Sequence, residues 1–508
     1  RLDIGGSLLA KYEPPDRNCP MTKGCLVSYS TNIPLVVDLD GTLTPTDTLV
    51  ESVVQVIKKS PLNFLVLPFW LLKGRAAFKH AVASRANISA EYLPYRLELL
   101  DYLKSEKEKG REIILATAAH YSIAANVNRH LGLFDQVLAT DGNVNLKGVR
   151  KLEAIRNCVG DKFSYVGDSQ DDLPIWKSAT AAVLVDVPEK TAAVVRGEVP
   201  VEREFARSPI RLSVWLQAFR VHQWLKNLLL FVPWITAFAF LDANKLAMLC
   251  MAFFAFSFAA SATYVVNDLW DLDSDRQHIR KRNRPFASAR LPISYGVGAA
   301  AFALITSIFI ASMVGEGFLI ILFVYLVLTS SYSWIFKEYV LIDVLMLSLL
   351  YTLRIFAGSV ATHIMTSSWL LAFSIFIFLS LALVKRCAEL ILINRDGKLA
   401  SNGRDYRVSD LTVLWPLGVG GALSSVVVFG LFISSHETQE RYGSPDLLWL
   451  VAFGLIYWLA RLWIKTSRGE MDDDPVVYAI KDRGSRIVIF CLFSVMIFAH
   501  SINIRLAP

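Results

Sequence analysis

Long apolar segments fill the chain after about residue 210, and they constrain its fold more than any other feature. Nine of these segments are long enough, or nearly so, to cross a hydrocarbon core that needs about 20 residues. They lie near 226–242, 245–266, 292–313, 317–335, 341–362, 368–384, 411–434, 446–464 and 486–504. The first 210 residues read as a water-soluble α/β domain. The sequence therefore predicts a soluble domain joined to an all-α polytopic membrane domain of about nine transmembrane helices.

The distribution of Lys and Arg among the loops predicts the orientation in the membrane. Most of these residues fall on one side, whereas the other side carries only Lys245, Arg441 and Arg505. By the positive-inside rule, the basic side and the soluble domain are cytoplasmic, which suits a multi-pass protein of the bacterial inner membrane. The loops also account for the net charge of +7, so we expect no nucleic-acid partner. The sequence leaves the oligomeric state open.

An acidic cluster follows the second apolar segment. The stretch Asn267-Asp-Leu-Trp-Asp-Leu-Asp-Ser-Asp275 places four carboxylates within eight residues. Asp268, Asp271 and Asp275 share one face of a helix end, and Asn267 joins Asp271 and Asp275 at helical spacing. Such carboxylates repel one another and are costly to desolvate, so oxygen coordination of a cation is favoured. We interpret the cluster as a magnesium-bound diphosphate site. A solvated acidic loop is the alternative.

A second acidic motif ends a predicted strand in the soluble half. Ile33–Val37 reads as a buried strand that runs into Asp38-Leu39-Asp40-Gly41-Thr42. Two carboxylates at this position suit a nucleophile and a general acid acting on one phosphate. Three elements follow in order: a strand that ends in Thr117, a basic segment with Lys151, and the stretch that contains Asp168 and Asp172.

This ordered set resembles the haloacid dehalogenase superfamily of phosphatases over about residues 31–200. The resemblance implies a Rossmann-like α/β domain with a helical cap at about 45–110. It makes Asp38 the nucleophile and Asp40 the acid/base, with Thr117 and Lys151 on the phosphoryl oxygens. Magnesium would be held by Asp38, Asp40 and Asp168, with Asp172 orienting the site. Lys147 stays open as an alternative to Lys151.

An apolar stretch inside the predicted cap, Phe64–Leu72, is too short to span a bilayer and contains Pro68. The flanking residues Lys58, Lys59, Lys73 and Arg75 suit anionic headgroups. The stretch is therefore either an interfacial membrane contact or part of the cap's own core.

The motif Asn-Asp-x-x-Asp-x-x-x-Asp on a multi-span protein resembles the UbiA superfamily of intramembrane prenyltransferases, over about residues 215–508. In that family a second aspartate-rich motif lies between the sixth and seventh spans. Here the same loop carries Lys385, Arg386 and Arg404. A basic second cluster binds phosphate directly, so the pocket suits one metal-chelated diphosphate together with phosphate monoesters.

The basic second cluster is similar to that of the decaprenyl-phosphate phosphoribosyltransferase branch of the family. Members of this branch also resemble this chain at residues 220–227, 332–343 and 354–358. The resemblance implies 5-phosphoribosyl 1-diphosphate (PRPP) as donor and a polyprenyl phosphate as acceptor. Magnesium would be held by Asn267, Asp268, Asp271 and Asp275. The implied substrate-binding residues are Lys226, Asn227, Arg282, Tyr332, Lys337, Arg354, Lys385, Arg386, Glu389, Arg404 and Tyr406. Any cation among them is alternatively a positive-inside anchor. We also expect Asp343 to pair with Arg354.

Together these features predict a bifunctional membrane enzyme with Mg²⁺ in both domains and both active sites on the cytoplasmic side. The transferase would make a lipid-linked 5-phosphoribose, and the phosphatase would remove its 5-phosphate, as a step in cell-wall or glycolipid synthesis. One alternative is an aromatic prenyltransferase that uses a prenyl diphosphate, fused to a phosphatase with an unrelated substrate. Another is a non-catalytic membrane scaffold. The expected layout is an N-terminal segment at 1–30, the phosphatase domain at 31–200, a linker at 201–214 and the transferase domain at 215–508.

Overall fold

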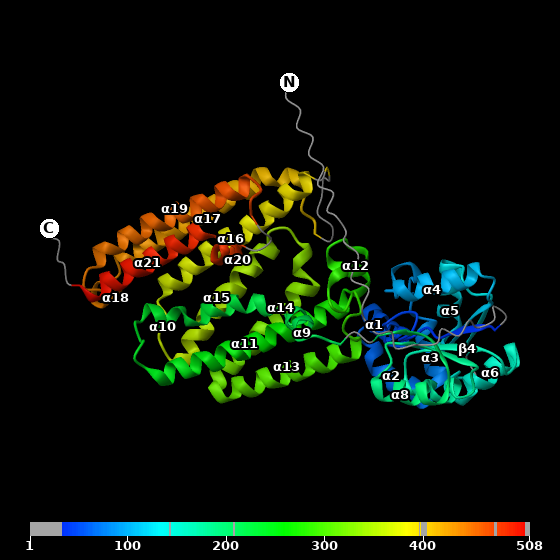
Figure 1. The fold of residues 1–508 in the computed structure, drawn as a ribbon. Helices are drawn as coiled ribbons and strands as arrows, with labels where there is room; N and C mark the ends of the chain where they lie inside the picture. Colours follow the sequence, from blue (N-terminus) through cyan, green and yellow to red (C-terminus); the bar gives the residue numbers. More distant parts are fainter. Residues whose placement is uncertain are drawn as a thin grey trace, which may run out of the picture. The chain divides into compact units, whose positions relative to one another are not determined.

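The computed structural model describes residues 33–141, 144–206, 209–395, 397, 404–471 and 475–502. Its ribbon is drawn in Figure 1. The chain forms two compact units. The first comprises Arg1–Leu43 and Arg96–Ser208, and the second comprises Thr44–Tyr95 and Pro209–Pro508. Residues 44–95, called the cap below, therefore group with the membrane helices.

A six-stranded parallel sheet forms the centre of the first unit, in the order β3-β2-β1-β4-β5-β6. Its strands are β1 (Leu35–Val37), β2 (Ile113–His120), β3 (Gln136–Thr140), β4 (Ser164–Gly167), β5 (Ala181–Val185) and β6 (Val201–Phe205). The helices are α4 (Leu97–Glu108), α5 (Tyr121–Leu131), α6 (Val149–Val159), η2 (Gln170–Asp172), α7 (Leu173–Trp176) and α8 (Glu189–Glu198). Strands β1 and β5 are apolar and wholly buried, as in parallel sheets covered on both faces. The predicted Rossmann-like α/β fold is confirmed.

Two segments of this unit differ from the expected layout. Residues 201–205, placed in a linker by the sequence, form the edge strand β6, which pairs with β5. Helix α4, placed within the expected cap range of 45–110, belongs to the sheet domain and buries Leu99 and Leu103 there. The segment Val-Glu-Arg-Glu-Phe is rich in charge and only partly buried, as is common for an edge strand, so its sequence gives a weak strand signal.

The cap contains α1 (Thr48–Lys59), α2 (Asn63–Leu72), α3 (Arg75–Ala83) and η1 (Ala90–Tyr92). No residue of α2 is buried, and Leu65, Phe69 and Leu72 are 64%, 66% and 85% exposed. The apolar stretch at 64–72 is thus not part of a cap core in this structure. Its contact with a membrane stays a prediction.

Eight helices in the described part of the second unit are long and apolar enough to cross a membrane. They are α11 (Ala243–Trp270), α13 (Ile293–Val314), α14 (Glu316–Trp334), α15 (Ile342–Thr362), α16 (Ser368–Arg395), α17 (Leu411–Ile433), α19 (Leu448–Ser467) and α21 (Arg483–Ser501). The shorter elements are α9 (Leu212–Ala218), η3 (Val221–Phe231), α10 (Val232–Thr236), α12 (Leu272–Gln277), η4 (Lys281–Asn283), η5 (Phe336–Glu338), η6 (Val408–Asp410), α18 (His436–Arg441), η7 (Pro445–Leu447) and α20 (Pro475–Lys481). The predicted polytopic all-α class is confirmed.

The segment at 226–242, expected to form a first spanning helix, instead divides into η3 and α10. Pro233 lies in the first turn of α10, where its missing N–H is tolerated. Element η3 packs so closely on α15 that a Cβ at Gly358 would lie 1.9 Å from the Leu230 carbonyl oxygen. The glycine therefore permits a backbone approach that any other residue would block.

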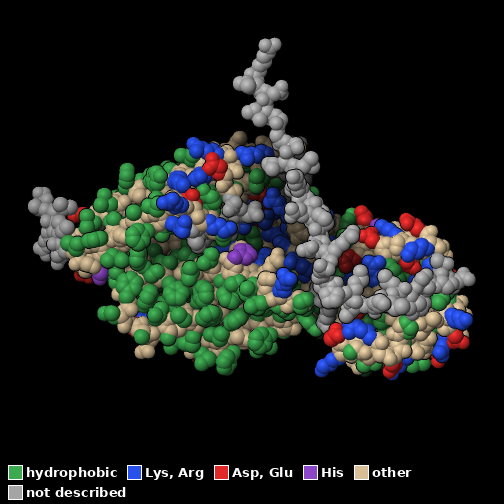
Figure 2. Space-filling model, viewed as in Figure 1, with side chains coloured by type: hydrophobic (Ala, Val, Ile, Leu, Met, Phe, Trp, Pro, Cys, Tyr) green, Lys and Arg blue, Asp and Glu red, His purple; other side chains and the backbone are tan. Residues whose placement is uncertain are grey.

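Hydrophobic side chains cover most of the visible face of the membrane helices in Figure 2. On the spanning helices, Phe302, Val327 and Phe453 are 70%, 63% and 74% exposed. In a soluble protein such a surface would be an aggregation hazard, whereas it suits contact with lipid chains. The second unit is therefore a multi-pass membrane domain.

Candidate functional sites

The soluble site lies at the carboxyl ends of three adjacent strands. Asp38 directly follows β1, Thr117 lies near the end of β2, and Asp168 directly follows β4. Strand β1 pairs with both β2 and β4, so the chain crosses over at this point of the sheet. Such a topological switch point is the usual ligand crevice of an open parallel sheet.

Lys151 on α6 connects the acidic side chains of this site. Its ammonium donates to Asp38 Oδ2 at 2.7 Å and to the Tyr165 hydroxyl at 3.0 Å, and it lies 3.6 Å from Asp172 Oδ1. The Lys151 side chain is only 4% exposed. Lys147, by contrast, is half exposed and pairs with Asp171. The geometry favours Lys151 over Lys147 as the lysine of the site.

Three carboxylates offer oxygens within 4.8 Å of one another: Asp38, Asp168 and Asp172. Burial raises the pKa of Asp168 to about 7, and the charges of Asp38 and Asp172 add to this shift. Burial also raises the pKa of Asp38, against the opposing charge of Lys151. Crowded, desolvated carboxylate oxygens favour a hard divalent cation, so this donor set fits Mg²⁺.

Gly41 keeps the turn after β1 close to Asp168. Its φ is +77°, and a Cβ there would lie 2.2 Å from Asp168 Oδ2. The next residue, Thr42, donates its hydroxyl to Asp168 Oδ1 at 3.0 Å. The turn that carries Asp40 is thus held against the acidic group of β4.

The other predicted residues of this site take different positions. Thr117 is fully buried, and its hydroxyl accepts a hydrogen bond from the Ala119 N–H at 3.0 Å. Asp172 accepts from the Tyr165 hydroxyl at 2.8 Å, which fixes its side chain. Asp40 is half-buried and lies outside the trio of closely spaced carboxylates.

The acidic cluster of the membrane domain lies at the junction of α11 and α12. Asp268 and Asp275 are 3% and 1% exposed. Asn267 donates to the Ser333 hydroxyl on α14 at 2.9 Å, and Asp271 lies 3.9 Å from Lys337. The predicted metal-binding residues therefore begin at the end of one spanning helix and continue into the following turn.

Two arginines that the site prediction omitted hold this cluster together. Arg220 contacts Asp268 Oδ1 at 2.5 Å, and Arg284 contacts Asp268 at 3.1 Å and Asp275 Oδ2 at 2.5 Å. Arg220 has a left-handed backbone, with φ +49°, which is uncommon outside glycine. Burial raises the pKa of Asp275, and the charge of Arg284 opposes it. A sequence signal existed for Arg220, since it opens the motif at 220–227.

The basic cluster lies at the end of α16 and in the following loop. Arg386 is 1% exposed and donates from Nε to Asp343 Oδ2 at 2.5 Å. Glu389 accepts from Arg386 and, at 2.8 and 3.0 Å, from Arg404 Nη1. Among the described residues, the buried Arg386 Nη2 and Arg404 Nε have no hydrogen-bond acceptor. Such donors favour binding of an oxyanion, because a buried guanidinium N–H without an acceptor costs free energy.

The two clusters meet on the loop between α14 and α15. Lys337 in η5 lies near Asp271, while the Glu338 carbonyl accepts from the Asp405 N–H at 3.1 Å. A single loop thus contacts the acidic cluster on one side and the segment that carries Arg404 and Tyr406 on the other.

Asp343 was expected to pair with Arg354, and this was wrong. Asp343 instead accepts from Arg386 and, at 2.5 Å, from the Tyr406 hydroxyl. Arg354 donates to Asn227 Oδ1 at 2.9 Å and to the Tyr325 hydroxyl at 3.2 Å. The side-chain partners of both residues come from other segments of the chain, and sequence separation gives no information about such pairs.

The remaining predicted substrate-binding residues are less closely grouped. The Lys226 ammonium lies 5.7 Å from the centroid of the Tyr351 ring, and Arg354 lies 5.6 Å from the same ring. Lys385 and Tyr332 are half-buried, whereas Arg282 in η4 is exposed. The structure does not bring Arg282 into either cluster.

Comparisons with known proteins give a family match for each of the two parts of the chain. Residues 228–481, half of the chain, match the family model described as UbiA prenyltransferase family. Residues 35–177 match the model described as haloacid dehalogenase-like hydrolase.

Three relatives extend these matches over most of their own lengths. The uncharacterized protein y4nM of Sinorhizobium fredii is 36% identical, over 93% of this chain and 92% of that protein. The nodulation protein NoeC of Azorhizobium caulinodans is 35% identical, over 57% of this chain and 94% of its own length. A decaprenyl-phosphate phosphoribosyltransferase of Corynebacterium glutamicum is 33% identical, over 54% of this chain and 85% of its own length.

Proposed function

The chain belongs to the UbiA prenyltransferase family and carries a haloacid dehalogenase-like hydrolase domain. We propose that it transfers a sugar phosphate to a lipid and then removes a phosphate group from the product. The membrane domain moves 5-phosphoribose from PRPP to a polyprenyl phosphate. The soluble domain then removes the 5-phosphate, which leaves polyprenyl-phosphoryl ribose.

The observation that carries this proposal is a pair of buried guanidinium N–H groups, Arg386 Nη2 and Arg404 Nε, that find no acceptor among the described residues. They sit where UbiA enzymes that use a prenyl diphosphate are expected to hold a second metal-binding aspartate cluster. Guanidinium donors bind phosphate oxygens directly, whereas they repel a divalent cation. The similarity to decaprenyl-phosphate phosphoribosyltransferases of three actinobacteria supports the same donor and acceptor.

In the transferase, Mg²⁺ bound by Asn267, Asp268, Asp271 and Asp275 would neutralise charge on the diphosphate. Arg284 and Arg220 compensate Asp268 in this structure, and their guanidinium groups would also supply hydrogen bonds to diphosphate oxygens. An oxygen of the lipid phosphate attacks the anomeric carbon while the bond from that carbon to the diphosphate breaks. The new bond forms on the opposite face, so the anomeric configuration inverts.

In the phosphatase, Asp38 attacks the phosphorus of the 5-phosphate and forms an aspartyl phosphate. Asp40 donates a proton to the departing ribose oxygen, and then removes a proton from the water that hydrolyses the phosphoenzyme. Lys151 compensates the negative charge that builds up on the phosphoryl oxygens. Mg²⁺ held by Asp38 and Asp168 would supply the remaining positive charge.

The proposed setting is the bacterial inner membrane, with both sites on the cytoplasmic side. PRPP is a polar, highly charged molecule, so a site that faces water on the basic side of the membrane domain suits it. The positive-inside distribution of Lys and Arg supports this orientation.

The decisive experiment supplies the purified full chain in nanodiscs with ribose-labelled PRPP, a polyprenyl phosphate and Mg²⁺. The wild-type protein should give labelled lipid without a 5-phosphate. Asp38→Asn should give labelled lipid that keeps it, with phosphate release lowered by at least about 1,000-fold. Asp268→Asn should give no labelled lipid. Transfer from a prenyl diphosphate to an aromatic acceptor, with PRPP inert, would favour the alternative function instead.

A further inference from the structure

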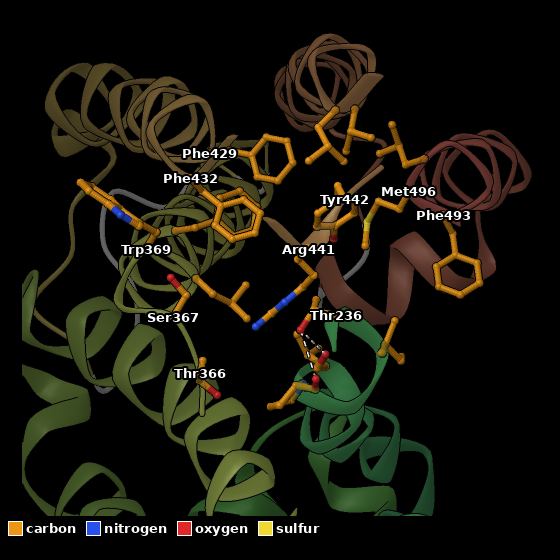
Figure 3. A pocket seen from close by; sticks show the side chains of 18 of the residues that line it. Thr236, Thr366, Ser367, Trp369, Phe429, Phe432, Arg441, Tyr442, Phe493 and Met496 are labelled. Atoms are coloured by element: carbon orange, nitrogen blue, oxygen red, sulfur yellow. Dashed lines mark hydrogen bonds between the residues drawn. The ribbon is translucent and has the colours of Figure 1, made fainter. Parts of the chain in front are cut away.

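An apolar cavity of about 380 Å³ opens between the membrane helices, away from both clusters (Figure 3). Residues from α10, α16, α17, α18, α19 and α21 and from the connection between α15 and α16 line it. Its volume falls within the range of ligand sites, about 300–1,000 Å³. Nearly all of the lining is hydrocarbon, for example Phe373, Phe432, Leu455 and Met496.

The cavity and the candidate transferase site lie toward opposite ends of the same helix. Trp369, at the start of α16, lines the cavity, whereas Arg386 is 17 residues farther along that helix. At 1.5 Å per residue the two positions are about 25 Å apart. The cavity is therefore not part of the site that would hold PRPP and the acceptor phosphate.

Polar groups of Arg441, Trp458 and Thr366 are among those that interrupt the hydrocarbon lining. Figure 3 shows the side chain of Arg441 extending into the space between Ser367 and Thr236. The indole N–H of Trp458, a residue 8% exposed, and the Thr366 hydroxyl are buried without a hydrogen-bond partner. One cation and two polar groups without partners, placed around an apolar space, suit an amphiphilic ligand with an anionic head group.

We propose that this cavity binds one anionic phospholipid of the surrounding bilayer. Its hydrocarbon chains fill the apolar space, and its phosphate contacts the Arg441 guanidinium. Arg441 is one of only three Lys or Arg residues that the sequence places on this side of the membrane domain. A cation there is contrary to the positive-inside trend, so a bound anion gives it a role. Charge complementarity also distinguishes this lipid from a zwitterionic one.

The test uses native mass spectrometry of the full chain released from micelles that contain equal amounts of phosphatidylglycerol and phosphatidylcholine. The wild-type protein should retain one phosphatidylglycerol in preference to phosphatidylcholine. Arg441→Gln should lower that retention at least tenfold. Leu455→Trp, which fills the cavity and keeps the charge, should lower it as well.

The matched control is Lys245→Gln, which removes a cation on the same side that already pairs with Asp242 at 3.2 Å. This variant should keep the lipid. Equal retention of both lipids by the wild-type protein, or unchanged retention by Arg441→Gln, would overturn the proposal. Displacement of the phosphatidylglycerol by one equivalent of polyprenyl phosphate would also overturn it, because the cavity would then belong to the acceptor lipid.

Discussion

At the scale of single residues, the soluble site depends on a lysine that is buried among carboxylates. Burial alone would lower the pKa of Lys151, but the charges of Asp38 and Asp172 raise it. Lys151 is therefore charged over the whole physiological range. A permanent positive charge beside Asp38, the proposed nucleophile, would stabilise the phosphoryl oxygens during transfer without proton exchange with solvent.

Replacing this lysine should distinguish its role from that of Lys147, which lies just before α6. Lys151→Met should lower the single-turnover rate constant for release of the 5-phosphate by about 100- to 1,000-fold, because a fixed donor to the transition state is lost. Lys147→Met should change it less than about threefold, because Lys147 forms an exposed pair with Asp171. The measurement is single-turnover phosphate release from the phosphoribosylated lipid. Equal losses in both variants would contradict the assignment of Lys151.

Gly41 offers a second test at this scale. Gly41→Ala should displace Asp168, because the new Cβ would lie 2.2 Å from its carboxylate oxygen. Phosphatase activity should fall at least tenfold while PRPP-dependent transfer persists. Gly132→Ala is the matched control: its φ is +63°, but no atom lies within 4 Å of the added Cβ. It should cost about 1 kcal/mol of stability and leave phosphate release unchanged. Similar kinetics for both variants would show that the clash is unimportant.

At the scale of elements, helix α1 of the cap packs on the acidic turn of the membrane domain. Glu51 is 2% exposed and accepts from Arg276 Nη1 and Nη2 at 2.9 and 2.6 Å. Gln55 donates to both Asp273 oxygens at 3.1 Å. Val50 and Val54 pack against the apolar cluster that includes Leu272 and Phe286. The cap is thus joined to the segment that carries the proposed metal-binding residues of the membrane domain.

Breaking the buried ion pair should loosen α1 selectively. Arg276→Gln leaves Glu51 buried without its bidentate partner, which typically costs about 3–5 kcal/mol. Hydrogen exchange in α1 should accelerate accordingly, while exchange in strands β1 and β4 stays the same. Lys177→Gln, which breaks an exposed pair with Glu198, should cost at most about 1 kcal/mol. Unchanged protection of α1 in Arg276→Gln would mean that apolar packing alone holds the cap.

Sequence patterns predicted the elements better than their pairings. Strand ends gave Asp38, Thr117 and Asp168 because local chemistry and the order of motifs decide those positions. Spacing along one helix paired Asp343 with Arg354, whereas the carboxylate meets Arg386 from another helix. The segment at 226–242 was apolar enough to span a membrane, yet it forms two short elements. Element η3 packs against Gly358, and Pro233 lies in the first turn of the separate helix α10. Contacts between distant segments depend on tertiary packing, which a single sequence does not encode in its periodicity.

At the scale of the whole molecule, the fusion joins two activities that would act in succession on one lipid. In the proposed sequence of reactions, the lipid-linked intermediate carries a 5-phosphate that the second site would remove. Tethering the sites keeps the phosphatase at a high effective concentration near each new product, on the order of millimolar for a short connection. A diffusing phosphatase would have to find the same lipid in the plane of the membrane.

This tethering predicts a difference between one intact chain and two half-active ones. Proteoliposomes with the wild-type protein should show little phosphoribosylated intermediate at any time. Vesicles that contain a one-to-one mixture of Asp38→Asn and Asp268→Asn chains at low protein density should accumulate it transiently before it is dephosphorylated. The lag arises because the intermediate must diffuse from a chain with an active transferase to one with an active phosphatase. Identical time courses would mean that the lipid exchanges freely between chains, and that the fusion provides co-expression but no kinetic coupling.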